Sequence, residues 1–254
     1  MGLARLTPYR SSRDEGLTVF LAGFPAGQLA ANCYFVGAEA GGECVIIDPG
    51  QDSAEGVDRL VAEHALKPAA VLVTHGHFDH MWQAQVVADK YDAPLWIGAA
   101  DRHLLADPMA AISNQSAAML RAQFGMGDLP DFREPGKVHE AVEGSVIEIE
   151  GLTIVVDHAP GHTPGTVLYR TAYDGDEDVE QLMFSGDFLF AGSIGRTDLV
   201  GGDHTQMLES LRNKVLPLAD NIVVFPGHGE QTSIGRERAT NPFLLDLQDA
   251  GSDQ

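Results

Sequence analysis

The chain has 254 residues, 44% of them hydrophobic, which suffices for one large domain or two small ones. Its net charge of −21 argues against nucleic acid and anionic membranes as partners, because both attract basic surfaces. No segment approaches the ~20 consecutive apolar residues of a membrane-spanning helix. The first 13 residues lack an apolar run of signal-peptide length, so the expectation is a cytoplasmic protein.

The first part of the chain alternates short apolar runs with turns that contain glycine, which is typical of β-strands. Strands are expected at residues 17–24, 32–36, 43–48, 71–73 and 94–97. Helices are expected at 53–66, with Ser53 as N-cap, and at 81–91. Cys33 and Cys44 flank a predicted turn and could face each other. Two cysteines are too few for a disulfide framework, so reduced core residues are expected.

The second part of the chain opens with a predicted helical insertion at 99–135, for which a role as a lid is left open. Further strands are expected at 146–149, 152–157, 166–171, 182–184 and 222–225. A helix is expected at 205–215, and the polar residues 247–254 are expected to fray. Runs of strands that then interleave with helices, without a repeat or linker, predict one mixed α and β domain over 1–254.

Four potential metal ligands follow directly after the apolar residues 71–73. In an extended backbone every second side chain points to the same side. His75, His77 and Asp79 are therefore expected to converge, with His80 facing a neighbouring point. Packing does not explain this crowding, because unpaired polar groups are costly to bury. Imidazole and carboxylate ligands suit zinc, iron or manganese, so the segment predicts a metal site.

Three later stretches repeat the order of strand, sharp turn and ligand-type residue. His162 lies in the sequence APGHTPG, Asp187 in FSGD and His228 in FPGHG. Glycines beside these residues permit tight turns and a close approach of the backbone to an ion. They are therefore candidates to complete the site begun at His75.

Together, THGHFDH, GHTPGT, SGDFLFAGSIGRTD and PGHGEQTSIG resemble the metallo-β-lactamase superfamily. Within it they are similar to short hydrolases of the glyoxalase II (hydroxyacylglutathione hydrolase) type. The resemblance covers residues from about 18 to 244. It implies an α+β fold, a four-layer αβ/βα sandwich of two mixed β-sheets with helices on the outer faces. A pair of metal ions would lie at one edge of the two sheets.

The resemblance also implies a role for each ligand. One metal ion would be held by His75, His77 and His162, and the second by Asp79, His80 and His228. Asp187 would bridge both ions, and Asp48 would support the ligands from behind. The implied cofactors are two divalent ions, zinc first, with iron or manganese as alternatives. The remaining histidines match no ligand position and are read as structural or exposed.

The implied reaction is hydrolysis by a metal-bridging hydroxide, with Asp79 and Asp187 as catalytic carboxylates. Metal binding lowers the pKa of water from 15.7 to about 7, so no general base is needed. A thiolate leaves readily because its thiol has a pKa of about 8.5. The expected substrate is therefore a small-molecule thioester, such as S-lactoylglutathione or the adduct of a related low-molecular-weight thiol. The oligomeric state is left open.

The sequence departs from the longer glyoxalase II enzymes, whose C-terminal helical domain helps to bind glutathione. Arg236 and Arg238 are offered instead as contacts for a substrate carboxylate, with salt bridging as the alternative. Arg196 is read as structural. The main rival function is a persulfide dioxygenase with a single iron, whose family typically lacks the complete second site. Another hydrolase of the same fold is the further alternative. The net charge of −21 opposes a nuclease, and the complete set of ligands argues against a non-catalytic metal-binding protein.

Overall fold

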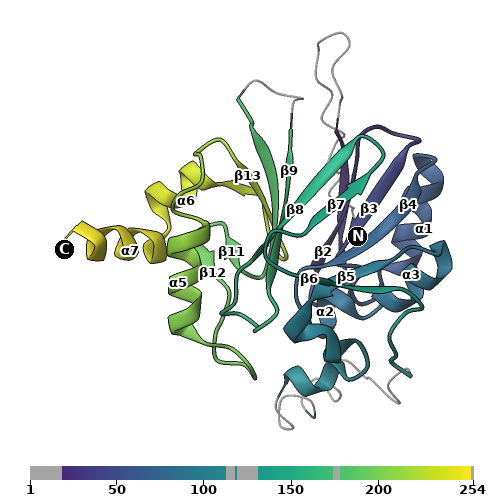
Figure 1. Ribbon diagram of the computed structural model, residues 1–254, viewed down its shortest axis with the longest axis horizontal. Coiled ribbons are helices and arrows are strands. Elements are labelled where there is room, and N and C mark those ends of the chain that lie inside the picture. The colour runs from purple at the N-terminus through teal and green to yellow at the C-terminus, as the bar shows by residue number, and fades with distance from the viewer. Residues whose placement is uncertain (1–18, 113–117, 119–130, 174–177, 253–254) are drawn as a thin grey trace.

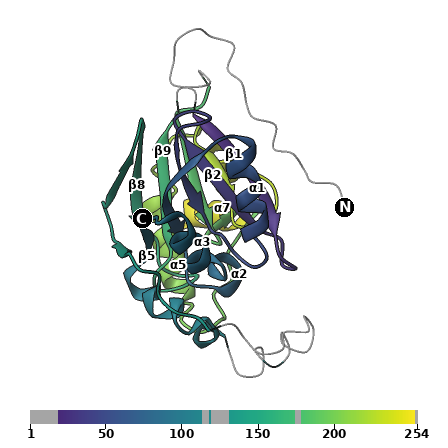
Figure 2. The same cartoon turned by 90° about the vertical axis from the view of Figure 1, so that its right-hand side faces the viewer.

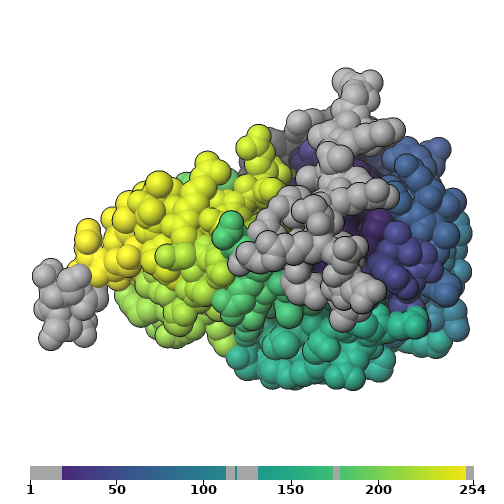
Figure 3. Space-filling model, turned by 90° about the horizontal axis from the view of Figure 1, so that it is seen from above, coloured from purple at the N-terminus to yellow at the C-terminus, as the bar shows by residue number. Residues whose placement is uncertain are grey.

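A computed structural model describes residues 19–112, 118, 131–173 and 178–252 of the protein, with side chains up to residue 249. Two six-stranded sheets face each other between two layers of helices (Figure 1). The predicted α+β sandwich with four layers is confirmed. Seen from above, the N-terminal and C-terminal halves lie side by side (Figure 3).

The first sheet has the strand order β1-β2-β3-β4-β5-β6, antiparallel from β1 to β3 and parallel from β3 to β6. Its strands are β1 (Phe20–Ala26), β2 (Ala31–Gly37), β3 (Glu43–Ile47), β4 (Lys67–Val73), β5 (Leu95–Gly98) and β6 (Val138–Ala141). The helices α1 (Ala54–Glu63), α2 (Phe78–Met81) and α3 (Ala84–Tyr91) connect its parallel strands. Figure 2 faces this layer, with α1 and α3 in front of the strands.

The second sheet has the order β14-β13-β10-β9-β8-β7, with one parallel pair, β10 and β13. Its strands are β7 (Val146–Ile149), β8 (Leu152–His158), β9 (Val167–Ala172), β10 (Gln181–Gly186), β13 (Val223–Pro226) and β14 (Thr232–Ser233). Three helices cover its outer face: α5 (His204–Lys214), α6 (Ile234–Thr240) and α7 (Pro242–Ser252). A small hairpin joins β11 (Leu189–Phe190) to β12 (Ser193–Ile194). Among the described helices, none is long and apolar enough to cross a bilayer.

The strands explain the four layers, because their alternate side chains enter different cores. In β4, Val71 and Val73 pack under α1 and α3, whereas Leu72 points into the space between the sheets. In β10, Phe184 enters that same central core, and Met183 packs under the C-terminal helices. Three apolar clusters therefore separate four layers, as period-two alternation requires when both faces of each sheet are covered.

This topology brings the functional segments to one edge. The parallel strands β3 and β4 end there at Ile47 and Val73, and the parallel strands β10 and β13 end there at Gly186 and Pro226. The residues that immediately follow these four ends include Asp48, His75, Asp187 and His228. Four loops that are far apart in sequence thus meet at the same rim of the sandwich.

Several local expectations need correction. Ser53 occupies the N-cap of α1 but makes no capping bond, because its hydroxyl donates to Gly50 O (2.8 Å) and the Gln83 side chain accepts from Ala54 N (2.5 Å). The tail expected to fray from residue 247 continues α7 to Ser252, since Leu247 is buried against the second sheet's outer core. Both cysteines are free and buried, as expected.

The predicted insertion at 99–135 begins as the 3₁₀ helices η1 (Ala99–Leu105) and η2 (Pro108–Ala111). Residues 113–117 and 119–130 lie outside the described part of the chain. The possible role of the insertion as a lid, which depends on these residues, stays a prediction. Strand β6 and the helices α6 and α7 were not expected from the sequence. The hydrophobic patterns of these segments are short or weak, so their secondary structure depends on tertiary packing.

Candidate metal centre

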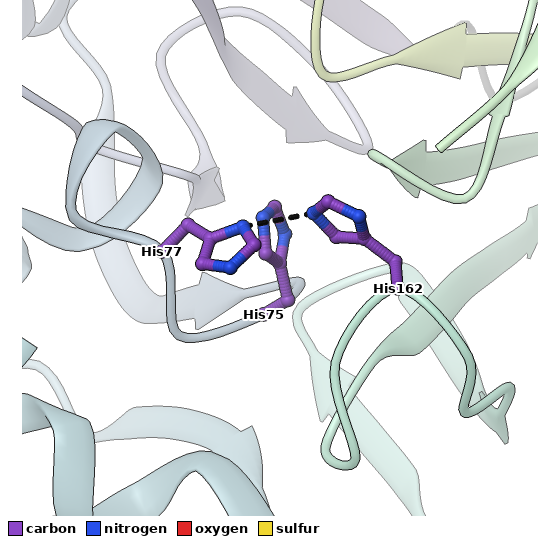
Figure 4. A group of neighbouring side chains, drawn as sticks. All are labelled: His75, His77 and His162. Carbon is purple, nitrogen blue, oxygen red and sulfur yellow. Dashed lines mark hydrogen bonds between the residues drawn. The ribbon is translucent and has the colours of Figure 1, made fainter. Parts of the chain in front are cut away.

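His75, His77 and His162 converge on one point from two halves of the fold (Figure 4). The first two lie in the loop between β4 and α2, and the third lies in the loop between β8 and β9. The distance from His77 Nδ1 to His162 Nε2 is 2.8 Å, and one nitrogen of each ring lies within 4.8 Å of the others. Three imidazole rings whose nitrogen atoms lie this close together can serve as ligands of one metal ion.

A second group lies directly beside the first. Asp79, His80 and His228 also bring ligand atoms within 4.8 Å of one another, with His228 Nε2 3.2 Å from Asp79 Oδ2. Asp187 stands between the two groups, 3.3 Å from His80 Nε2 and 3.8 Å from His162 Nε2. The structure thus brings together all seven side chains that the sequence predicts as ligands.

The buried polar atoms of the centre fit a metal ion. Within the part of the chain that the structure describes, His75 Nε2, His77 Nε2 and Asp187 Oδ1 are buried and have no hydrogen-bond partner, although Asp187 Oδ1 forms an ion pair with His80 Nε2. Such orphaned atoms are rare in native proteins because each one costs free energy. Five imidazoles and two carboxylates, with no thiolate, form a donor set that suits divalent zinc, iron or manganese. The residues present therefore fit two divalent ions.

Burial and mutual repulsion hold most of the imidazoles of the first group neutral. Burial, together with nearby imidazoles, lowers the pKa of His75 well below its usual range and that of His77 to about 3. Burial alone would also lower the pKa of His80, but the Asp187 and Asp79 carboxylates raise it well above the usual value. Burial would raise the pKa of Asp187, yet neighbouring histidines lower it. The carboxylates are therefore ionised and the first group is neutral, as metal ligation requires.

These shifts predict a pH-dependent stability for the metal-free protein. Below pH 6.5, His75 and His77 bind protons in the unfolded chain but stay largely neutral in the folded chain, where their pKa values are lowered, so stability falls as pH is lowered toward 5. In the same interval His80 is protonated in both states. At ~1.4 kcal/mol per pH unit for each group, we expect a loss on the order of 3 kcal/mol from pH 6.5 to 5.

Urea denaturation of the metal-free protein at the two pH values measures this loss. The variant His77→Asn should lose less stability over the interval, whereas His204→Asn, on the exposed surface of α5, should behave as the wild type. Equal stability of the wild type at pH 6.5 and 5 would contradict the assignment of neutral buried histidines.

Asp48 supports the ligands from behind, at the end of β3. Its Oδ2 lies 2.9 Å from His80 Nδ1 and accepts from Thr74 Oγ1 (2.6 Å), while its Oδ1 accepts from Thr74 N (2.7 Å). Thr74 Oγ1 in turn lies 3.1 Å from His75 Nδ1. A hydrogen bond to the far nitrogen of an imidazole fixes its orientation toward an ion. Asp48 thus lies where the sequence analysis expects it.

Arg196 contributes through its backbone. Its carbonyl oxygen lies 2.7 Å from His162 Nδ1, and its guanidinium pairs with the exposed Asp198 at 2.7 Å. The reading of its side chain as structural agrees with this pair. The contact that orients His162 uses a main-chain atom, which a sequence motif does not reveal.

Asp101 is a functional residue that the sequence analysis missed. It is fully buried at the start of η1, where Oδ2 accepts from Gly76 N (2.7 Å) and Thr163 Oγ1 (2.6 Å). Its Oδ1 accepts from Gly165 N (2.8 Å). The carboxylate therefore ties the loop that carries His75 and His77 to the loop that carries His162. One buried acid holds together the two halves of the first ligand group.

Two glycines shape the space around Asp187. A Cβ on Gly227 would lie 2.3 Å from Asp187 Oδ1 and 2.5 Å from His80 Cε1, and one on Gly195 would lie 1.7 Å from Asp187 O. No side chain fits at these positions without moving a ligand. The glycines in the motifs PGHG and GSIG are therefore part of the cradle.

Of the two alternatives given for Arg238, a substrate contact or a salt bridge, the structure shows a salt bridge. Its guanidinium pairs with Asp220 and donates to the carbonyl oxygens of Leu216 and Leu218, so it fastens α6 to the end of α5. Arg236 is exposed on α6, and its substrate contact stays a prediction. Of the other histidines, His64 packs against Phe20 and His139 stacks on Trp96, in agreement with structural roles.

Comparison with known proteins gives this geometry a family context. The family model described as the metallo-beta-lactamase superfamily matches residues 26–228. An uncharacterized protein of Mycobacterium tuberculosis is 43% identical over 230 residues, which cover 90% of this chain and 99% of the relative. Hydroxyacylglutathione hydrolase GloC of Haemophilus influenzae is 34% identical over 200 residues, which cover 78% of this chain and 86% of the relative.

Solved structures show the same fold. The chain is similar to the crystal structure of the BLEG-1 B3 metallo-beta-lactamase, with a TM-score of 0.73, 37% identity and coverage of 89% of this chain and 99% of that one. It is also similar to TTHA1623 in a di-iron-bound form, with a TM-score of 0.66, 34% identity and coverage of 87% and 98%. Both likenesses extend over most of each chain.

Proposed function

Because the chain belongs to the metallo-β-lactamase superfamily, we propose that it is a metal-dependent hydrolase that cleaves small-molecule thioesters. The observation that carries this proposal is the complete pair of ligand groups with Asp187 between them. One divalent ion would be held by His75, His77 and His162, and a second by Asp79, His80 and His228. When bound, such ions lower the pKa of water to about 7 and polarise a carbonyl oxygen.

The chain's own residues then set the electrostatics of the reaction. Asp187 and Asp79 stay ionised because histidines lower their pKa values against the effect of burial. Asp48 and the Arg196 carbonyl keep His80 and His162 turned toward the centre. The His228 side chain is 30% exposed, against 15% for that of Asp187, so a substrate reaches the centre past His228. These groups are preorganised before the substrate arrives.

The leaving group favours a thioester over an amide. Within the described residues, the buried acidic and imidazole groups of the centre all serve as ligands or hold ligands in place. None is left to protonate an amine as it departs, whereas a thiolate needs no proton because its thiol has a pKa of about 8.5. The 34% identity to hydroxyacylglutathione hydrolase GloC supports the same substrate class.

Two rivals have their own tests. Hydrolysis of β-lactams is favoured by the 37% identity to BLEG-1, described as a B3 metallo-beta-lactamase. A persulfide dioxygenase with one iron would use the first ligand group, but it gives no reason for the complete second group of Asp79, His80 and His228. A chromogenic cephalosporin and oxygen uptake with a persulfide distinguish these reactions from thioester cleavage.

Metal removal is the direct test of the proposed function. We expect purified protein to hold about two divalent ions per chain, to lose thioesterase activity on chelation, and to regain it with zinc, iron(II) or manganese. Elemental analysis and hydrolysis of S-lactoylglutathione and S-lactoyl-N-acetylcysteamine measure this. His228→Ala should bind fewer ions, and the matched exposed variant His204→Ala should keep both. Fully metallated protein that cleaves neither thioester would overturn the proposal.

A further inference from the structure

A cavity of about 620 Å³ lies beside the loop that follows His228, and the ligand roles do not account for it. Its walls come from the end of the β1–β2 hairpin and from the loop that follows His228. Pro25, Tyr34 and Phe225 give it a largely apolar lining, and Asn32 and Glu230 are polar members. This volume is typical of sites for small molecules.

The cavity is joined to the metal centre through the His228 loop. The Asn32 side-chain amide donates to Pro226 O (3.0 Å) and Gly229 O (3.1 Å), on either side of His228. The Tyr34 hydroxyl donates to Pro226 O (2.8 Å). His228 is also the most exposed of the ligands in the ion pairs of the centre, and the residues that directly follow it, Gly229 to Gln231, line the cavity.

Tyr34 is held firmly in the lining, and the described lining residues carry no positive charge. The Tyr34 ring packs against Phe184 and Phe225 with centroids 5.4 and 5.6 Å away, and its hydroxyl is already used. Glu230, which is exposed, is the charged member of the lining among the residues that the structure describes, and none of these is a lysine or arginine. A carboxylate in the cavity would lose water and gain no cation, which is unfavourable.

The size of the cavity indicates which part of a thioester it takes. A 2-hydroxyacyl group such as lactoyl has only a few heavy atoms and is held by the reacting carbonyl at the centre. A cavity of about 620 Å³ has room for a larger group. The thiol moiety is the larger part of such a substrate. Arg238 was a candidate partner for a carboxylate of the substrate, but its guanidinium pairs with Asp220.

We propose that this cavity binds the thiol moiety of the thioester and selects an uncharged, largely apolar thiol over one that carries carboxylates, such as glutathione. The inference rests on the proposed thioesterase function. Selection follows from desolvation in an apolar lining and from repulsion by Glu230. The metal centre would then accept the acyl group, and the cavity would set the thiol specificity.

The test compares lactoyl thioesters that differ only in the thiol: glutathione, N-acetylcysteamine and benzyl mercaptan. We expect kcat/KM for the benzyl thioester to exceed that for the glutathione thioester by at least about tenfold, a typical ratio for differential contacts in an apolar pocket. Glu230→Lys should shift the ratio toward glutathione by about two- to fivefold, the range that exposed charge pairs allow. Glu209→Gln, exposed on α5, should leave the ratio unchanged.

Filling the cavity gives a second readout that does not need turnover. Gln231 lines the cavity and is exposed, so Gln231→Trp should fold and occupy the space. Calorimetry with a non-hydrolysable benzyl thioether should show at least about tenfold weaker binding to this variant than to Gln206→Trp, whose substitution lies on α5. Equal binding to both, or a preference for the glutathione thioester that Glu230→Lys does not change, would overturn the cavity assignment. Failure of the proposed function itself would appear as no cleavage of any thioester, with the binding result still deciding about the cavity.

Discussion

Asp187→Asn is expected to lower kcat/KM for thioester hydrolysis by about 10³-fold and to reduce the bound metal below two ions per chain. Asp187 is the carboxylate that reaches both ligand groups, 3.3 Å from His80 Nε2 and 3.8 Å from His162 Nε2. An amide has nearly the same shape but no charge, so it cannot bridge two cations. Charge stabilisation by such a centre is worth several kcal/mol, and each 1.36 kcal/mol is tenfold in rate.

The measurement pairs steady-state kinetics with elemental analysis, and both must change. Asp246→Asn makes the same chemical change on the exposed surface of α7 and should keep the wild-type rate and metal content. An Asp187→Asn protein that retains two ions and a rate within tenfold of the wild type would show that Asp187 is not shared. In that case its buried Oδ1, which lacks a hydrogen-bond partner, would need another explanation.

The ligands could be predicted from the sequence because each one has a recognisable pattern in the residues directly around it. A run of apolar strand residues ends directly before His75, and glycines flank His162, Asp187 and His228. Period-two alternation and glycine chemistry act over a few residues, so a reader of the sequence can apply them without knowing the tertiary structure. The same alternation predicted most strands, and the two sheets followed from the family resemblance.

The supporting contacts could not be predicted, because they join segments that only the fold brings together. The Gln83 side chain, which lies beyond β4 in the sequence, accepts a hydrogen bond from the first residue of α1, Ala54. The Ser53 hydroxyl donates to Gly50 O instead. The sequence left open whether Arg238 contacts a substrate or forms a salt bridge, and only the fold shows that α6 places it against Asp220. Other cations of this acidic chain, among them Lys90, Arg102 and Arg170, also pair with carboxylates, so the number of cations says little about substrate binding.

Asp101 is the clearest example of a supporting contact that the sequence does not reveal. Its substitution is the second one for which we expect a large effect. Asp101→Asn should weaken metal binding by the group of His75, His77 and His162 by about 10- to 100-fold, the usual effect of losing an outer partner of metal ligands. The carboxylate accepts from Gly76 N, Gly165 N and Thr163 Oγ1. An asparagine offers one acceptor oxygen and turns an NH₂ toward a buried donor, which costs about 1–3 kcal/mol.

The two ligand groups can be tested separately. In a His228→Ala background the first group remains intact, and in a His162→Ala background the second does. Competition titrations with a chelator should show that Asp101→Asn weakens binding strongly in the first background and little in the second. Asp107→Asn, an exposed residue at the start of η2 that makes no capping bond, is the matched control in both. Equal weakening in both backgrounds would mean that Asp101 stabilises the whole rim, whereas selective weakening would show that one buried carboxylate positions one half of the metal centre.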